Sequence, residues 1–352
     1  MRRIELAGGR ALGDGQPCFV IAEAGVNHNG SLDIALKLVD VAAAAGADAV
    51  KFQTFRAEHI ITRSAPKAQY HVETTGGDST QSWFDLLKSQ ELTPDMHRAL
   101  IARCEERGIM FMSTPYDFES VDLLDDLGVE LYKVASTDLD NVALLDHMSR
   151  KKRPIILSTA MSTLDEVKAS LQVVRQHVGD VLVMQCTGDY PAPAADANLN
   201  AMLTIGRECG VITGYSDHVM NSAVAFGAIA MGAKAYEKHF TVGRWLPGPD
   251  HRASIDPDQL TRLITDIRIV ESALGDGKKA IMASEQKNRG RLRKSLLAAR
   301  NIASGSILTP GDIVVKRAGG QGLAAGSYFG ALGKRVIRDL RLEEPISDDV
   351  LE

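Results

Sequence analysis

Two histidines lie where the sequence most clearly suggests metal chemistry. Ser216-Asp217-His218 follows the strand-like run 211–214, and His239 ends the strand-like run 235–239. Two imidazoles on adjacent strands would hold a divalent metal and leave coordination positions open for a substrate, as a Lewis acid requires. A single histidine in a strand is more often a satisfied core residue. Spacing alone leaves both interpretations open.

Two lysines and several hydroxyls end other strand-like runs. Lys51 lies in the run 49–52, and Lys133 lies in the run 131–134. The hydroxyl-bearing residues at comparable positions are Ser113, Thr114, Ser136, Ser158, Thr159 and Ser216. Gathered at one site, ammonium and hydroxyl groups would bind a compact phosphate or a phosphorylated acid. The alternative is that each lysine is simply solvated, and the accompanying hydroxyls argue against it.

An acidic residue, Glu23, follows the first strand-like run at 18–22. It could act as a general base or as a substrate ligand. The alternative is a buried ion pair with Lys51 or Lys133, which would perturb its pKa without any catalytic role. The loop Pro247-Gly248-Pro249-Asp250-His251 could close over a polar substrate. Cys186 has no evident base nearby, which favours a packing role.

Regular alternation of strands and helices explains how these side chains could meet. Helix-like stretches separate eight strand-like runs, at 18–22, 49–52, 109–113, 131–134, 155–158, 181–185, 211–214 and 235–239. This count predicts a (β/α)8 TIM barrel, with an open doubly wound sheet as the alternative. In such a barrel the reacting groups lie at the carboxyl ends of the strands. The fold class is therefore α/β.

The pattern of residue types along the chain changes after Leu274. We assign residues 1–283 to the barrel, residues 284–294 to a polar, basic linker, and residues 295–352 to a small β-rich domain. Within that domain, strands are predicted at 296–299, 314–317 and 334–336. About 58 residues bury too little surface to be very stable alone, so this domain is expected to dock on something.

Composition restricts the class of protein. The formal charge is −5, and 45% of the 352 residues are hydrophobic, which is typical of a globular chain with an ample core. Mild acidity argues against nucleic-acid or anionic-membrane partners. Four well-separated cysteines without a C-x-x-C pair favour reduced thiols in a cytoplasm.

Several short motifs together resemble the sialic acid synthase family, which comprises N-acetylneuraminate synthase and its legionaminate and pseudaminate relatives. The matching segments are 21–30 (IAEAGVNHNG), 50–54 (VKFQT), 113–115 (STP), 132–136 (YKVAS), 157–159 (LST), 214–218 (GYSDH), 237–241 (EKHFT) and 247–251 (PGPDH). Residues 295–352 resemble the family's antifreeze-like SAF domain, of the β-clip type. The likeness therefore covers nearly the whole chain.

The resemblance implies a reaction and a set of partners. The family condenses phosphoenolpyruvate with an open-chain 2-acetamido hexose, giving a nine-carbon 2-keto-3-deoxy acid and phosphate. It also implies a domain-swapped homodimer and a divalent metal, Mn2+ first and Mg2+ or Co2+ as alternatives. We expect N-acetylmannosamine as the acceptor. The alternatives are a legionaminate or pseudaminate synthase using a diacetamido-trideoxyhexose and, from other classes, a Schiff-base aldolase or a non-catalytic sugar-acid binding protein.

The resemblance also implies roles for individual residues. His218 and His239 match the metal-binding histidines, and Glu23 matches the residue that activates or positions water. Positions that hold phosphoenolpyruvate are matched by Lys51, Thr114, Lys133, Ser136, Ser158 and Ser216. Positions near the sugar are matched by Gln53, Tyr190 and Asp250, and Arg317 matches an SAF arginine that reaches the partner subunit's sugar site.

Three positions depart from the family pattern. Ala318 follows Arg317 where relatives usually have proline, Gly188 replaces a side chain that commonly faces the sugar, and Asp138 stands where relatives often carry glutamate. These changes leave the phosphoenolpyruvate half intact and put the identity of the sugar in doubt. The segments around Glu23 and Asp250 look closer to the neuraminate and legionaminate branches than to pseudaminate.

Overall fold

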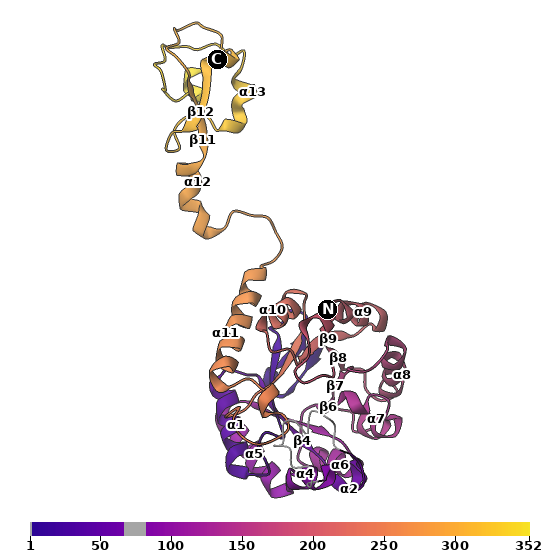
Figure 1. The fold of residues 1–352 in the computed structure, drawn as a ribbon. Coiled ribbons are helices and arrows are strands. Elements are labelled where there is room, and N and C mark those ends of the chain that lie inside the picture. Colours follow the sequence, from indigo (N-terminus) through magenta and orange to yellow (C-terminus); the bar gives the residue numbers. More distant parts are fainter. Residues whose placement is uncertain (1, 67–81) are drawn as a thin grey trace. The chain divides into compact units, whose positions relative to one another are not determined.

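The computed structural model describes residues 2–66 and 82–352, which form two compact units, 1–275 and 276–352. The first unit is built on eight parallel strands, coloured from indigo to orange along the chain in Figure 1. They are β3 (Phe19–Gly25), β4 (Ala49–Thr54), β5 (Met110–Pro115), β6 (Tyr132–Val134), β7 (Ile155–Ser158), β8 (Val181–Cys186), β9 (Ile212–Asp217) and β10 (Ala235–His239). Each predicted strand is present, with ends shifted by at most a few residues.

The order of these strands confirms the barrel. They pair in the order β5-β4-β3-β10-β9-β8-β7-β6, so the first strand of the ring, β3, lies beside the last, β10. The outermost strands of that order, β5 and β6, also lie in contact. The sheet therefore closes as in a (β/α)8 barrel, and an open doubly wound sheet is excluded.

Helices surround the barrel, as the periodicity predicts (Figure 1). The longer ones are α1 (Leu32–Ala44), α5 (Pro94–Arg107), α6 (Phe118–Asp126), α7 (Val142–Ser149), α8 (Leu164–Val174), α9 (Leu199–Cys209), α10 (Ser222–Ala230) and α11 (Pro257–Leu274). Side chains of Ser31, Thr93 and Thr163 cap α1, α5 and α8 by accepting hydrogen bonds from backbone N–H groups. Two shorter helices, α2 (Ala57–Ile60) and α4 (Trp83–Ser89), follow β4.

The barrel interior changes from apolar to polar along each strand. Alternate side chains point inward, so Ile21 is followed by Glu23, Met112 by Thr114, and Ile156 by Ser158. The apolar members form one buried cluster, joined by Leu12 of a hairpin, β1 (Arg3–Glu5) and β2 (Ala11–Gly13), that closes the amino end. The polar members are thereby confined to the carboxyl end.

The second unit is a small domain with its own core. Its antiparallel pair, β11 (Lys294–Ala298) and β12 (Ile313–Arg317), confirms two of the predicted strands. The third, at 334–336, is present only as isolated bridges of Arg335 and Val336. A cluster including Leu296, Leu340 and Ile346 fills the interior. Before β11, the exposed α12 (Gln286–Leu292) occupies most of the predicted linker; α13 (Tyr328–Ala331) follows β12.

Candidate active site

One cavity of about 770 Å³ opens at the carboxyl ends of the barrel strands. Of the thirteen site residues predicted from the sequence, twelve line it: Glu23, Lys51, Gln53, Thr114, Lys133, Ser136, Ser158, Tyr190, Ser216, His218, His239 and Asp250. The thirteenth, Arg317, ends β12 in the second unit, where its side chain is exposed. The cavity is large enough for two small substrates together.

Four buried charges form the floor of this cavity. Lys51 Nζ lies 3.0 Å from Glu23 Oε2 and 3.5 Å from Glu237 Oε2, and Lys133 Nζ lies 3.8 Å from Glu237 Oε1. All four side chains are at most 5% exposed. Two ammonium groups and two carboxylates leave this cluster close to neutral when all four are ionised, and protonation of one carboxylate would leave it with a net positive charge.

The two carboxylates differ in pKa because their surroundings differ. Burial raises the pKa of Glu23 to about 7, against the opposing charge of Lys51. Burial also acts to raise the pKa of Glu237, but Lys133 and Lys51 outweigh it and lower the value to about 2. Glu237 is therefore a fixed negative charge, whereas Glu23 can exchange a proton near neutral pH. The ion pair anticipated as the alternative for Glu23 is present together with a pKa suited to catalysis.

Hydroxyl groups fix the two ammonium groups in place. Lys51 donates to Thr114 Oγ1 at 3.0 Å, and Lys133 donates to Ser158 Oγ at 2.6 Å. Ser216 donates to Glu237 at 3.2 Å. Both ammonium groups are therefore held in fixed positions at the cavity floor, where the strand ends predict that an anion would bind.

The predicted histidine pair faces the same cavity. The rings of His218 and His239 have centroids 5.5 Å apart. His218 Nδ1 donates to the carbonyl oxygen of Thr187 at 2.6 Å, which leaves its Nε2 as the nitrogen with a free lone pair. His239 Nδ1 is buried without a hydrogen-bond partner in the protein. Burial lowers the pKa of both imidazoles, that of His218 to about 4, so both are neutral at physiological pH.

These features fit a divalent metal, although the protein supplies few ligands. Neutral imidazoles are the form that binds metal, and an orphaned buried nitrogen is a vacant ligand position. Among residues 2–66 and 82–352, no group of three or more His, Cys, Asp or Glu side chains is spaced to hold an ion. Two imidazoles would leave the remaining coordination positions to water and substrate, as the sequence predicts.

Tyr190 and Cys186 complete the surroundings of the histidines. The Tyr190 ring packs on His218 with centroids 4.0 Å apart and lies edge-on to His239 at 5.7 Å. Cys186 Sγ lies 3.8 Å from His218 Nδ1, but that nitrogen carries the proton donated to Thr187 and is therefore not a base toward the thiol. Burial also raises the pKa of this thiol to about 11, which keeps it protonated and agrees with a packing role.

The loop 247–251 forms one wall and is tied to the first βα loop. Asn29 donates to the carbonyl oxygen of Pro247 at 2.8 Å, and His251 contacts Thr241 Oγ1 at 2.7 Å. Gly248 has a φ of +148°, and a Cβ there would lie 2.8 Å from Asn29 Oδ1, so only glycine fits. The loop therefore presents Asp250 from a fixed position. Burial raises the pKa of Asp250 to about 6.

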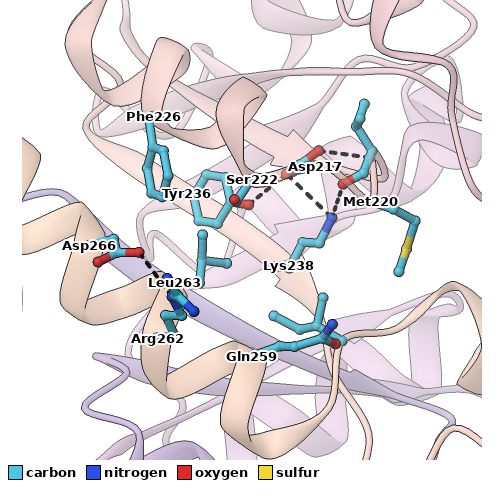
Figure 2. Close-up of a pocket in the computed structure, with 12 residues that line it drawn as sticks. Asp217, Met220, Ser222, Phe226, Tyr236, Lys238, Gln259, Arg262, Leu263 and Asp266 are labelled. Atoms are coloured by element: carbon cyan, nitrogen blue, oxygen red, sulfur yellow. Dashed lines mark hydrogen bonds and ion pairs between the residues drawn. The ribbon is translucent and has the colours of Figure 1, made fainter.

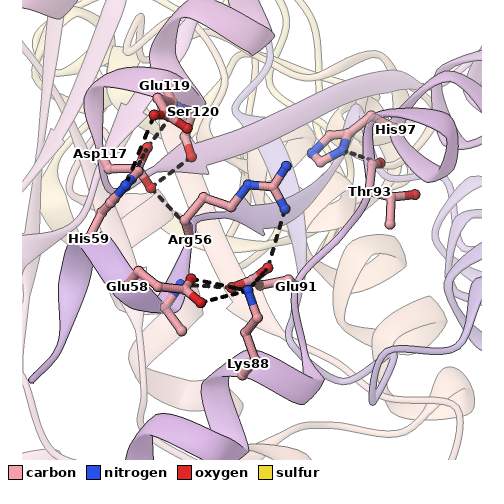
Figure 3. Close-up of polar contacts among 11 residues, drawn as sticks. Arg56, Glu58, His59, Lys88, Glu91, Thr93, His97, Asp117, Glu119 and Ser120 are labelled. Carbon is pink, nitrogen blue, oxygen red and sulfur yellow. Dashed lines mark hydrogen bonds and ion pairs between the residues drawn. The ribbon is translucent and has the colours of Figure 1, made fainter. Parts of the chain in front are cut away.

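The outer wall of the cavity is apolar and comes from two short helices. Ile60 of α2 and Trp83, Leu86 and Leu87 of α4 line it. Figure 3 shows the polar network that joins these helices. Lys88 bridges Glu58 and Glu91 at 2.9 and 3.1 Å, and Glu91 also accepts from the backbone of Ala57. Sequence inspection found the polar floor but not this wall, because apolar helix residues carry no distinctive chemical signal.

Glu237 is the main site residue that the predicted site set lacked. Although its position at a strand end was evident, only the neighbouring strands show its contacts with both lysines and Ser216. The alternation of inward-facing residues 235, 237 and 239 on β10 was the available signal.

The fold, a (β/α)8 barrel followed by a small β domain, and the paired lysines and histidines in one cavity of the barrel agree with the family that the sequence motifs indicate. The chain belongs to the NeuB family, whose model matches residues 38–279, and an SAF domain model matches residues 293–352. Both parts of the resemblance found in the sequence are thereby confirmed.

Curated relatives cover nearly the full length. The chain is 40% identical over 333 residues to the N,N'-diacetyllegionaminic acid synthase of Campylobacter jejuni, spanning 94% of this chain and 99% of the relative. It is 40% identical to the synthase of the same name from Legionella pneumophila, spanning 93% of each. It is 33% identical to human N-acetylneuraminate-9-phosphate synthase, spanning 99% of this chain and 97% of the relative.

Solved structures agree with this assignment. The N-acetylneuraminic acid synthetase of Leptospira borgpetersenii, in complex with citrate, superposes with a TM-score of 0.71 at 32% identity, covering 82% of this chain and 95% of that one. The spore coat polysaccharide biosynthesis protein SpsE of Bacillus subtilis superposes with a TM-score of 0.66 at 30% identity, covering 100% of this chain and 99% of that one.

Among the described residues, no helix has the length and hydrophobicity needed to cross a bilayer.

Proposed function

We propose that this enzyme condenses phosphoenolpyruvate with an open-chain acetamido hexose, releasing phosphate and a nine-carbon 2-keto-3-deoxy acid. The proposal rests on one observation: Lys51, Lys133, His218 and His239 all line the same cavity. The lysines suit the carboxylate and phosphate of one substrate. The histidines suit a metal next to the carbonyl of the other.

Each group of site residues has its own role in the proposed reaction. Lys51 and Lys133, held by Thr114 and Ser158, bind phosphoenolpyruvate so that its carbon 3 can attack the aldehyde carbon of the sugar. His218 and His239 would hold the metal, Mn2+ first and Mg2+ or Co2+ as alternatives, which when bound polarises the aldehyde oxygen. As the carbon–carbon bond forms, the aldehyde oxygen takes up a proton and carbon 2 is left electron-deficient, so water adds at carbon 2 and gives one proton to Glu23. The tetrahedral intermediate then collapses to the ketone and expels phosphate.

The acceptor we propose is a diacetamido-trideoxyhexose, as in a legionaminate synthase. Our first expectation from the sequence, N-acetylmannosamine, is supported less well. The two relatives at 40% identity are both N,N'-diacetyllegionaminic acid synthases, and the neuraminate-9-phosphate and pseudaminic acid synthases are 33% and 29% identical. The apolar wall of Ile60, Trp83 and Leu87 also suits the methyl groups of a deoxy, doubly acetylated sugar better than a hydroxyl-rich one.

We further propose a homodimer in which the SAF domain of one subunit completes the site of the other. The small size of this domain and the exposure of Arg317 support that arrangement. Arg317 would reach the sugar of the partner site and add the cation that the sugar side of the barrel cavity lacks among its described lining residues.

Phosphate release from phosphoenolpyruvate tests the reaction. We would measure it with Mn2+, with and without EDTA, against N-acetylmannosamine, its 6-phosphate and 2,4-diacetamido-2,4,6-trideoxymannose. We expect EDTA-sensitive release that is fastest with the diacetamido sugar. Faster release with N-acetylmannosamine would restore our first expectation for the acceptor. No release with any sugar, from folded protein that binds Mn2+, would contradict the proposal and favour a binding protein.

A further inference from the structure

Behind the histidine pair, on the helix-facing side of the barrel wall, lies a buried polar cluster of Asp217, Tyr236 and Lys238 (Figure 2). Asp217 is 1% exposed, Tyr236 0% and Lys238 3%. Because side chains alternate along a strand, these three point away from the cavity that their neighbours His218 and His239 line. The cluster takes no direct part in the mechanism proposed above.

Register places Asp217 and Lys238 directly opposite each other. They are paired residues of the neighbouring strands β9 and β10, and Lys238 Nζ lies 3.4 Å from Asp217 Oδ2. The tyrosine hydroxyl donates to the same carboxylate oxygen at 2.6 Å. Each member of the ion pair immediately precedes one of the two histidines in the chain.

The same two side chains also hold the chain just after His218. Asp217 Oδ1 accepts a hydrogen bond from the backbone N–H of Val219 at 2.8 Å, and Lys238 Nζ donates to the carbonyl oxygen of Val219. Both backbone groups of Val219 are therefore taken by the ion pair. His218 lies between Asp217 and Val219, so its backbone is held on both sides.

Other charged groups near the cluster come from α11. Arg262 and Asp266 line the small pocket beside it, but they pair with each other at 3.8 Å, and Gln259 is neutral. Lys238 forms its ion pair with Asp217. A buried ion pair contributes little net stability, because desolvation offsets the attraction, so such a pair suggests a role in fixing geometry.

We propose that Asp217 and Lys238 form a clasp that positions His218 relative to His239 for metal binding. They are positioning residues that touch neither substrate nor metal. The inference rests on the proposed metal role of the two histidines. Removing a group that orients a metal ligand without touching the metal typically changes metal affinity about 10- to 100-fold.

The test separates positioning from stability. Lys238→Met leaves the buried carboxylate of Asp217 without its cation, so we expect it to lower the melting temperature and to weaken Mn2+ binding, measured by electron paramagnetic resonance, by about 10-fold or more. The double variant Asp217→Asn, Lys238→Met removes both charges. We expect it to recover most of the thermal stability and to keep the weak Mn2+ binding, because the contact with the Val219 carbonyl is still missing.

A matched control uses an ion pair at the opposite end of the barrel. Arg268 lies 2.8 Å from Asp48, which immediately precedes β4, and Arg268→Met should lower stability without changing Mn2+ affinity. Mn2+ affinity of the double variant within twofold of wild type would overturn the clasp. So would an equal loss of affinity in Arg268→Met.

A metal-free measurement keeps the clasp distinguishable from the metal proposal. Nitrogen NMR of labelled histidine reports the tautomer of His218, which the bond to Thr187 fixes as Nδ1–H. We expect that tautomer in the wild type and a mixture in the double variant, and an unchanged tautomer would contradict the clasp. Absence of Mn2+ binding by the wild type would refute the metal proposal while this measurement still decides the clasp.

Discussion

Glu23 and Lys51 lie on neighbouring strands of the barrel with their charged atoms 3.0 Å apart, both shielded from solvent. Burial keeps the pKa of Glu23 at about 7 in spite of the lysine. Its protonation can therefore respond to what binds beside it, which is the property that a proton acceptor needs.

This pKa predicts the acid side of the pH profile. Below about pH 7 Glu23 is increasingly protonated and cannot accept a proton from water, so kcat should rise with pH through that value. Glu23→Gln should lower kcat at least about 100-fold and remove this rise. Steady-state phosphate release from acid to mildly alkaline pH checks the expectation. A variant with the wild-type profile would assign the ionisation to another group.

Lys133 distinguishes condensation from Schiff-base chemistry. Burial lowers the pKa of its ammonium group, as an imine-forming lysine would need, but Ser158 and Glu237 already hold it. We expect borohydride with pyruvate to leave the protein unmodified in mass spectrometry, and Lys133→Met to lower kcat/KM for phosphoenolpyruvate about 100-fold. Lys278→Met, at an exposed surface position, is the control. A reduced pyruvate adduct lost only in Lys133→Met would establish an aldolase.

Tyr190 should support the histidine pair through its ring. Because the ring packs 4.0 Å from that of His218, Tyr190→Ala should weaken Mn2+ binding about threefold to tenfold. Tyr190→Phe keeps the ring and should bind Mn2+ within about twofold of wild type. Titration of Mn2+ followed by paramagnetic resonance compares the three proteins. Equal loss in both variants would assign the effect to the hydroxyl.

The hairpin at the amino end should contribute to stability but not to catalysis. Leu12 is 1% exposed and packs in the apolar interior of the barrel. Leu12→Ala should lower the free energy of unfolding by roughly 2–4 kcal/mol, because it leaves a cavity. Denaturant unfolding measures this loss, and kinetics at a permissive temperature should be unchanged. A large fall in kcat without loss of stability would link the two ends of the barrel.

Mixed subunits can reveal a shared site. Arg317→Ala should raise KM for the sugar while leaving KM for phosphoenolpyruvate unchanged, and His218→Ala should be inactive. In a domain-swapped dimer, a heterodimer of these variants contains one site with both wild-type residues. Co-refolding equal amounts should therefore restore about a quarter of wild-type activity. No recovery, with heterodimers demonstrated by mass, would mean that Arg317 serves its own subunit.

The sequence motifs alone did not identify the acceptor sugar. The motifs around Lys51, Glu23 and His218 concern the half of the site shared across the family, so they identified the reaction class and not the sugar. The relatives at 40% identity, together with the apolar wall of α2 and α4, favour the diacetamido sugar. That wall depends on packing between short helices, which the sequence pattern does not specify.

The residue pattern was enough to predict the eight strands and the polar residue at each strand end, because inward-facing positions recur with a period of two along a strand. It also determined that these ends would share one face, since parallel strands of a barrel all point the same way. This reasoning was enough to predict four site residues, Glu23, Lys51, His218 and His239.

Contacts between these residues could not be predicted from the pattern and are seen only in the folded barrel. Lys51 meets Glu237, far along the chain, because ring closure pairs β3 with β10, so that β4 and β10 flank the same strand. The low pKa of Glu237 and the value near 7 for Glu23 follow from that arrangement. Likewise, Asp217 and Lys238 become opposed only through the register of β9 and β10. Distances between strands depend on sheet closure and register, and these are set by the packing of the whole barrel rather than by local sequence.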